Sequence, residues 1–103
     1  MMKIYDAARG MFAKDPVENT KISRTFRNCD RVQIDFGSSG VTSLEIEHRL
    51  DEEAEWISAV GPIAPTEDSE LYIIPDSRYQ RIVFVDGDDT QIAWATRTSS
   101  TVS

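Results

Sequence analysis

The chain has 103 residues, a single cysteine and a formal net charge of −7. This length suits one domain. A lone Cys29 excludes an intramolecular disulfide, so we expect a small buried apolar side chain in a reducing compartment.

The charge is unevenly distributed along the chain. Residues 1–31 hold seven Lys or Arg and four acids, whereas residues 32–103 hold four Arg and fourteen acids. A basic leading segment thus precedes a strongly acidic body. The simpler interpretation of this charge is a well-solvated surface. The acidic body argues against nucleic acid as a partner, because phosphate neutralisation needs clustered Lys and Arg.

No apolar stretch is long enough for the core of a signal peptide or for a membrane-spanning helix. We therefore expect no membrane contact, and we expect the chain to be made and folded in the cytoplasm of the cell that produces it.

The first twenty residues leave three alternatives open. Residues 5–14 have the composition of two or three helical turns capped by Asp6, although Gly10 weakens such a helix. Asp15-Pro16 would end it. An extended docking arm or an added edge strand fits this segment as well. We expect residues 1–20 to form an N-terminal arm or short helix.

From residue 21 onward, strand signals recur about every ten residues, as in a sandwich or barrel. Residues 22–27 predict a first strand with Ile22, Arg24 and Phe26 in one register, and residues 32–36 alternate apolar and polar side chains with a period of two. Gly37-Ser38-Ser39-Gly40 then predicts a hairpin turn.

Residues 41–60 predict a β-hairpin. Leu44, Ile46, His48 and Leu50 share one side of a two-residue period, which is typical of a strand with one face on a core. The acidic residues 51–53 break this alternation, and a second apolar run opens at residue 56.

Three more strands are expected at residues 71–74, 81–85 and 91–96. Pro75 stops the first, because proline cannot donate to a ladder. The second is almost entirely apolar, which predicts a central strand covered on both faces. Asp86-Gly87-Asp88-Asp89 predicts a tight turn before the third.

These elements predict an all-β fold, an antiparallel β-sandwich that is immunoglobulin-like or jelly-roll-like with about seven strands. The sandwich should occupy residues 21–98. Residues 99–103 are small and polar and should form a flexible tail.

No catalytic motif stands out, so we expect the chain not to be an enzyme. The only histidine, His48, lies in a core-facing register, which favours a structural role over general-base catalysis. The acidic runs at residues 51–55 and 86–89 offer oxygen ligands to a hard cation but lack EF-hand spacing. We favour solvated turns, with no metal and no cofactor.

The aromatic residues allow two interpretations. Trp56, Tyr72, Tyr79 and Trp94 lie in or beside expected strands, where they would either anchor the core or stack on sugar rings. We favour core anchors for Trp56 and Trp94. The Tyr79 hydroxyl is placed to tie a crossing loop to the sheet.

A motif in the second half resembles a known family. Arg49-Leu50-Asp51-Glu52-Glu53 is followed by Trp56, and later by Tyr79-Gln80-Arg81 at the start of an apolar strand. In this order the chain resembles the small β-sandwich accessory proteins of tailed bacteriophage virions, with glutamates where the family has turn glycines. The resemblance covers residues 30–97.

The resemblance implies a virion structural role, as a capsid decoration or cement protein that binds the major capsid protein and acts as a homodimer or homotrimer. The basic and apolar residues of the leading segment would then contact the capsid, namely Arg9, Met11, Phe12, Lys14, Lys21 and Arg24. Two rival functions stay open: a carbohydrate- or receptor-binding module of a virion or tail fibre, and a small tail or connector protein that assembles into rings.

Overall fold

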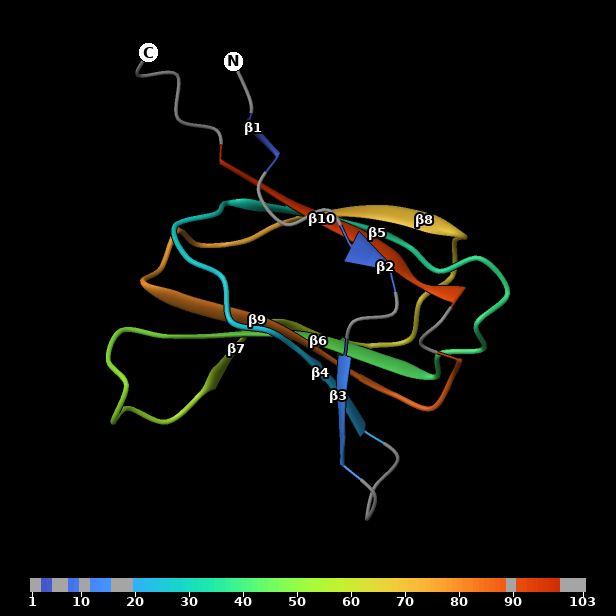
Figure 1. The fold of residues 1–103 in the computed structure, drawn as a ribbon, viewed down its shortest axis with the longest axis horizontal. Coiled ribbons are helices and arrows are strands. Elements are labelled where there is room, and N and C mark those ends of the chain that lie inside the picture. Colours follow the sequence, from blue (N-terminus) through green and yellow to red (C-terminus); the bar gives the residue numbers. More distant parts are fainter. Residues whose placement is uncertain (1–2, 5–7, 10–11, 16–19, 89–90, 99–103) are drawn as a thin grey trace.

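The computed structural model describes the backbone of residues 3–4, 8–9, 12–15, 20–88 and 91–98, and the side chains of residues 20–88 and 91–97. Two antiparallel sheets face each other as two layers (Figure 1). The predicted β-sandwich is therefore confirmed. No helix in the described part of the chain is long and apolar enough to cross a membrane.

The first sheet has the order β1-β10-β5-β8, with β2 also paired to β10. Its strands are β1 (Lys3–Ile4), β2 (Ala8–Arg9), β5 (Arg31–Asp35), β8 (Ser69–Ile73) and β10 (Ala93–Thr98). The second sheet has the order β3-β4-β9-β6-β7. Its strands are β3 (Phe12–Asp15), β4 (Thr20–Ser23), β6 (Ser43–Arg49), β7 (Ile57–Ile63) and β9 (Tyr79–Val85).

The strand order differs from that of a constant-type immunoglobulin domain, most clearly at its first and last strands. There the first strand joins the second and fifth, and the last strand joins the sixth. Here β4, the first long strand, pairs with β9, while the last strand, β10, pairs with β5. The first and last strands have exchanged sheets.

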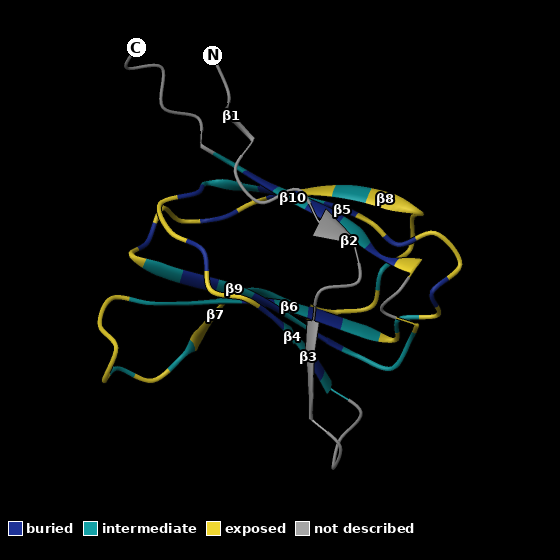
Figure 2. Ribbon diagram, in the orientation of Figure 1, coloured by how far each residue is buried: buried dark blue, intermediate teal, exposed yellow. Residues whose placement is uncertain are grey.

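The core lies between the layers, where one face of each sheet is buried (Figure 2). Its members are Phe26, Cys29, Val32, Ile34, Phe36, Leu44, Ile46, Tyr72, Ile74, Ile82, Phe84, Ile92 and Trp94. Cys29 is fully buried, as expected, and Trp94 is the predicted core anchor at 3% exposure.

Strand β9 is central in its sheet, but the expectation that both its faces are covered is wrong. Burial alternates along the strand, so Ile82 and Phe84 face the core while Val83 and Val85 are half-buried on the outer face. A nearly continuous apolar run therefore need not be covered on both sides.

The predicted hairpin at residues 41–60 is confirmed, since β6 and β7 pair antiparallel. The run at residues 37–40 is not a hairpin turn, because it carries the chain from β5 in the first sheet to β6 in the second. Asp86 and Gly87 both have positive φ, at 60° and 88°, so the expected tight turn forms and leads to the other sheet.

The N-terminal segment follows the edge-strand alternative at its described residues. Strands β1 and β2 extend the first sheet along β10, and β3 extends the second along β4. A helix over residues 5–14 is excluded, because it would include residues that lie in β2 and β3. Residues 99–103, expected to form a tail, lie outside the described residues.

Candidate functional site

The acidic turn between β6 and β7 is shaped by Asp51. Its carboxylate accepts a hydrogen bond from the Glu53 amide at 2.9 Å, and its carbonyl accepts one from the Ala54 amide at 3.0 Å. Neither Glu52 nor Glu53 has a positive φ. The side-chain bond of Asp51 thus closes the turn without the glycines that the resembling family has.

Beside this turn, arginine and aromatic side chains alternate on the outer face of the second sheet. The Arg49 guanidinium lies 4.4 Å from the Trp56 ring centroid and 5.6 Å from that of Tyr79. Arg81 lies 4.2 Å from Trp56, and Arg27 lies 5.0 Å from Tyr79. We call Arg27, Arg49, Trp56, Tyr79 and Arg81 the arginine–aromatic cluster.

The strand register explains how the cluster forms. Arg49 lies opposite Tyr79, and Glu47 lies opposite Arg81, across the β6–β9 pair. All four side chains therefore leave the same outer face, and Trp56, just before β7, meets two of them. Each such cation–π contact contributes about 0.5–1 kcal/mol at a partly exposed site.

Farther from the turn, the same outer face carries acidic side chains. Glu47 accepts a hydrogen bond from Arg81 Nε at 2.8 Å, in an ion pair with both side chains mostly buried. Burial, and then the nearby Glu47 carboxylate, raise the pKa of Glu45 above its ordinary value of 4.5. A shallow depression of about 520 Å³ adjoins the cluster, lined by Asp51, Glu52, Glu53, Arg78 and Tyr79.

Trp56 is therefore not the core anchor that we expected. It is half-buried on the outer face, in contact with two arginines, and it is absent from the core. The sequence held one signal for this position: Arg49 and Arg81 each occupy the outward register of their strands. That signal points to Trp56 only once the pairing of β6 with β9 is known.

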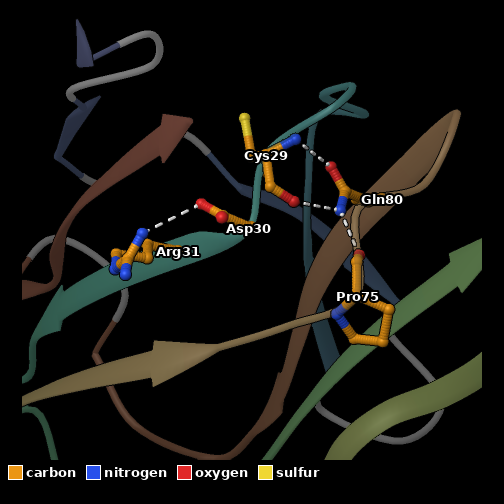
Figure 3. Close-up of polar contacts among 5 residues, drawn as sticks. All are labelled: Cys29, Asp30, Arg31, Pro75 and Gln80. Atoms are coloured by element: carbon orange, nitrogen blue, oxygen red, sulfur yellow. Dashed lines mark hydrogen bonds and ion pairs between the residues drawn. The ribbon is translucent and has the colours of Figure 1, made fainter. Parts of the chain in front are cut away.

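The expected tie between sheet and loop comes from Gln80 rather than from Tyr79. Gln80 is fully buried, its Oε1 accepts a hydrogen bond from the Cys29 amide, and its Nε2 donates to the carbonyls of Cys29 and Pro75 (Figure 3). The Tyr79 hydroxyl contacts only Glu52, at 3.5 Å.

The residues expected to contact a partner do not form one described surface. Arg9 lies in β2, and Phe12 and Lys14 lie in β3, but their side chains are outside the described set, as is all of Met11. Lys21 points inward beside the core and is only 5% exposed. Arg24 is exposed, with its guanidinium 5.9 Å from the Trp94 ring centroid.

His48 takes its expected register beside Leu44 and Ile46, although it is only half-buried. Among the described residues, no group of three His, Cys, Asp or Glu side chains is arranged to hold a metal ion. Asp89, at the end of the second acidic run, lies outside that set.

Exposed aliphatic side chains do not share a single face: Ile57 and Ile63 pair with the core-facing positions His48 and Leu44, whereas Leu71 and Ile73 lie on the outer face of the first sheet. The largest in the described part are Leu50 (74%), Ile57 (57%), Ile63 (37%), Leu71 (48%) and Ile73 (71%). Leu50 lies in the β6–β7 turn, and the others lie on β7 and β8, the edge strands of the two sheets. Strand β2 in the first sheet and β3 in the second are joined by only two residues, so these two strands lie on the same side of the sandwich. β8 and β7 are the edge strands at the other end of each sheet, so they share the opposite side.

Comparisons of the chain with protein-family models, with curated proteins and with solved structures found no match.

Proposed function

We propose that the chain is a non-enzymatic virion structural protein, a capsid decoration or cement protein that binds the outer surface of the major capsid protein and stabilises the shell. Exposed aliphatic residues scattered singly are common. Here two of them, Ile57 and Ile63, lie on β7, an edge strand of the second sheet, where a protein partner would cover them. This observation carries the proposal.

The arrangement of the motif residues adds support. Trp56, Tyr79 and Arg81, on which the resemblance to phage accessory proteins rests, come together in the arginine–aromatic cluster. The motif thus corresponds to one structural unit, a hairpin held to the central strand of its sheet.

We place the capsid contact on β7, through Ile57 and Ile63. This strand is an irregular edge: its pairing with β6 shifts register twice, and Pro62 lies within it. Such an edge is unsuited to further strand pairing, so it would bind through its side chains. The basic residues of β2 and β3, Arg9 and Lys14, provide a second candidate contact.

The test is co-sedimentation of the purified chain with tailed-phage capsids that lack it. We expect saturable binding that weakens at least about tenfold in an Ile57→Lys/Ile63→Lys double variant. Leu50→Lys is the control, because it makes the same kind of change at an exposed aliphatic residue outside β7.

An Arg9→Glu/Lys14→Glu variant separates the two contacts. If only this variant loses binding, the contact lies on the N-terminal strands and the β7 assignment is wrong. If the unmodified chain does not bind capsids, the decoration proposal is wrong.

Carbohydrate or receptor binding is the second candidate, because Trp56 and Tyr79 lie together on an outer face beside an open depression. The arginines stacked on both rings count against sugar stacking there. A saturable glycan-induced change in tryptophan fluorescence, abolished in Trp56→Phe, would favour this function over capsid decoration.

A further inference from the structure

The free edge of β8 is regular, in contrast to that of β7. Five consecutive pairs join β8 to β5 without a register shift, and no proline lies within the strand. Natural sheets usually protect such an edge with a bulge, a proline or an inward-pointing charge. The β7 edge has two register shifts and Pro62, whereas β8 has neither a bulge nor a proline; its one inward-pointing charge is Glu70, which Tyr72 hydrogen-bonds, and its outward side chains include Leu71 and Ile73.

The hydrogen-bond pattern fixes which backbone groups of β8 face outward. The Phe36 amide donates to the Asp68 carbonyl at 2.7 Å, and the Ile74 amide donates to the Asp30 carbonyl at 2.9 Å. Even-numbered residues of β8 therefore bond to β5. Because bonding alternates along an antiparallel pair, the amides and carbonyls of Ser69, Leu71 and Ile73 point away from β5, toward the free edge.

We infer that β8 pairs antiparallel with β8 of a second copy of this chain, around a two-fold axis at Leu71. This register places Leu71 opposite Leu71 of the second copy and Ser69 opposite its Ile73. The three residues with free backbone groups then bond to the same three residues in the second copy. Pro75, which has no amide proton, lies just beyond this set and ends the ladder.

The side chains are self-complementary in this register. On the inner face, Glu70 lies opposite Tyr72 of the second copy, so each carboxylate meets a phenol; within one chain Tyr72 already donates to Glu70. On the outer face, Arg31 neighbours Ile73 and Asp35 neighbours Ser69. The two rows on either side of the axis therefore each have a cation at one end and an anion at the other, which favours antiparallel pairing of identical edges.

The contact is small, because only five residues per copy form the seam, so the dimer should be weak by the standard of stable interfaces. The charge of −7 on each copy also opposes association. Screening by salt should therefore tighten the dimer. The inference does not depend on capsid binding, since the purified chain alone tests it.

Sedimentation velocity over a range of protein concentrations is the first test. We expect a monomer–dimer equilibrium whose dissociation constant decreases when the NaCl concentration is raised from about 20 mM to about 500 mM. Leu71→Lys, which places two lysines together at the two-fold axis, should raise the dissociation constant at least about tenfold. Leu50→Lys, with the same change at an exposed aliphatic residue outside β8, should leave it unchanged.

Disulfide trapping gives an independent readout of the register. Cys29 is fully buried, so an introduced cysteine would be the accessible thiol. Residues opposite each other in a bonded antiparallel pair have Cα atoms about 5.5 Å apart, within disulfide reach. Leu71→Cys should form a covalent dimer on oxidation much faster than Leu50→Cys.

Equal trapping rates, a monomer at every concentration, or an assembly larger than a dimer would overturn the inference. Circular dichroism confirms that each variant is folded, and Leu71 is exposed enough for its substitution to leave the core intact.

Discussion

At the scale of single residues, Gln80 fixes the geometry of one end of the sandwich. Its side-chain amide bonds to both backbone groups of Cys29 and to the Pro75 carbonyl, so it joins β9 to the segments that precede β5 and follow β8. The Gln80 backbone also exchanges two hydrogen bonds with Phe26. A fully buried amide is stable here because its oxygen and nitrogen both have partners.

We predict that Gln80→Met lowers the free energy of unfolding by about 3 kcal/mol, because it removes three hydrogen bonds to backbone groups, two of them on the buried Cys29. Urea denaturation measures this loss. Gln33→Met is the matched control: Gln33 is half-buried and its side chain donates to the Ser69 hydroxyl on the surface, so its substitution should cost less than about 0.5 kcal/mol. Equal losses in the two variants would contradict this role for Gln80.

The raised pKa of Glu45 predicts that the stability of the fold depends on pH. Its pKa is raised in the folded state, so between its ordinary value of 4.5 and that raised value the folded chain binds more protons than the unfolded chain. Stability contributed by this residue therefore falls as the pH rises through that window. We predict that Glu45→Gln is more stable than the parent at pH 7, and that the difference disappears below the ordinary pKa.

Thermal denaturation at several pH values measures this difference. Glu47→Gln provides a contrast, because it removes the carboxylate paired with Arg81 and should lower stability at pH 7. A destabilised Glu45→Gln at pH 7 would show that its bond to Ser58 outweighs the cost of burial.

At the scale of elements, the arginine–aromatic cluster holds the β6–β7 hairpin against β9. We predict that Trp56→Ala and Arg81→Ala each destabilise the chain. A double-mutant cycle should give a coupling of about 0.5–1 kcal/mol between the two residues, as expected for a cation–π contact. Substituting Arg24, whose guanidinium lies over the Trp94 ring, should show no coupling with Trp56. A coupling near zero for Trp56 and Arg81 would mean that their contact contributes no stability.

Sequence periodicity predicted the long strands well but not their surroundings. Alternation placed Leu44, Ile46, His48 and Leu50 on one side of a strand; the structure agrees for the first three, but Leu50 lies beyond the end of β6 and is 74% exposed. It carried no information on which strands are neighbours, so the meeting of Trp56 with Arg49 and Arg81 could not be predicted. The same limitation made residues 37–40 look like a hairpin turn, because a glycine-bounded turn has similar composition whether it joins neighbouring strands or crosses between sheets.

At the scale of the whole molecule, the N-terminal strands close one side of the sandwich. β2 lies on β10 and β3 lies on β4, so the segment passes from one sheet to the other. Strands of two to four residues are too short for a period to be recognised, which explains why an arm, a helix and an edge strand fitted the sequence equally well.

We predict that a chain starting at Thr20 is less stable and self-associates more than the full chain, because it loses β1–β3 and exposes the edges of β4 and β10. Light scattering and urea denaturation measure both effects. The double variant Arg9→Glu/Lys14→Glu keeps the backbone pairs and serves as the control. A truncated chain as stable and monomeric as the full one would show that these strands are dispensable.

The pairing of β1 with β10 also determines how the molecule would respond to force. Lys3 lies opposite Thr98 and Ile4 opposite Arg97, so a load between Lys3 and Thr98 would peel β1 away one pair at a time. A load along β5 would instead be shared by five pairs with β10 and five with β8. The chain should therefore resist a load carried along its central strands better than one that separates residues 3 and 98.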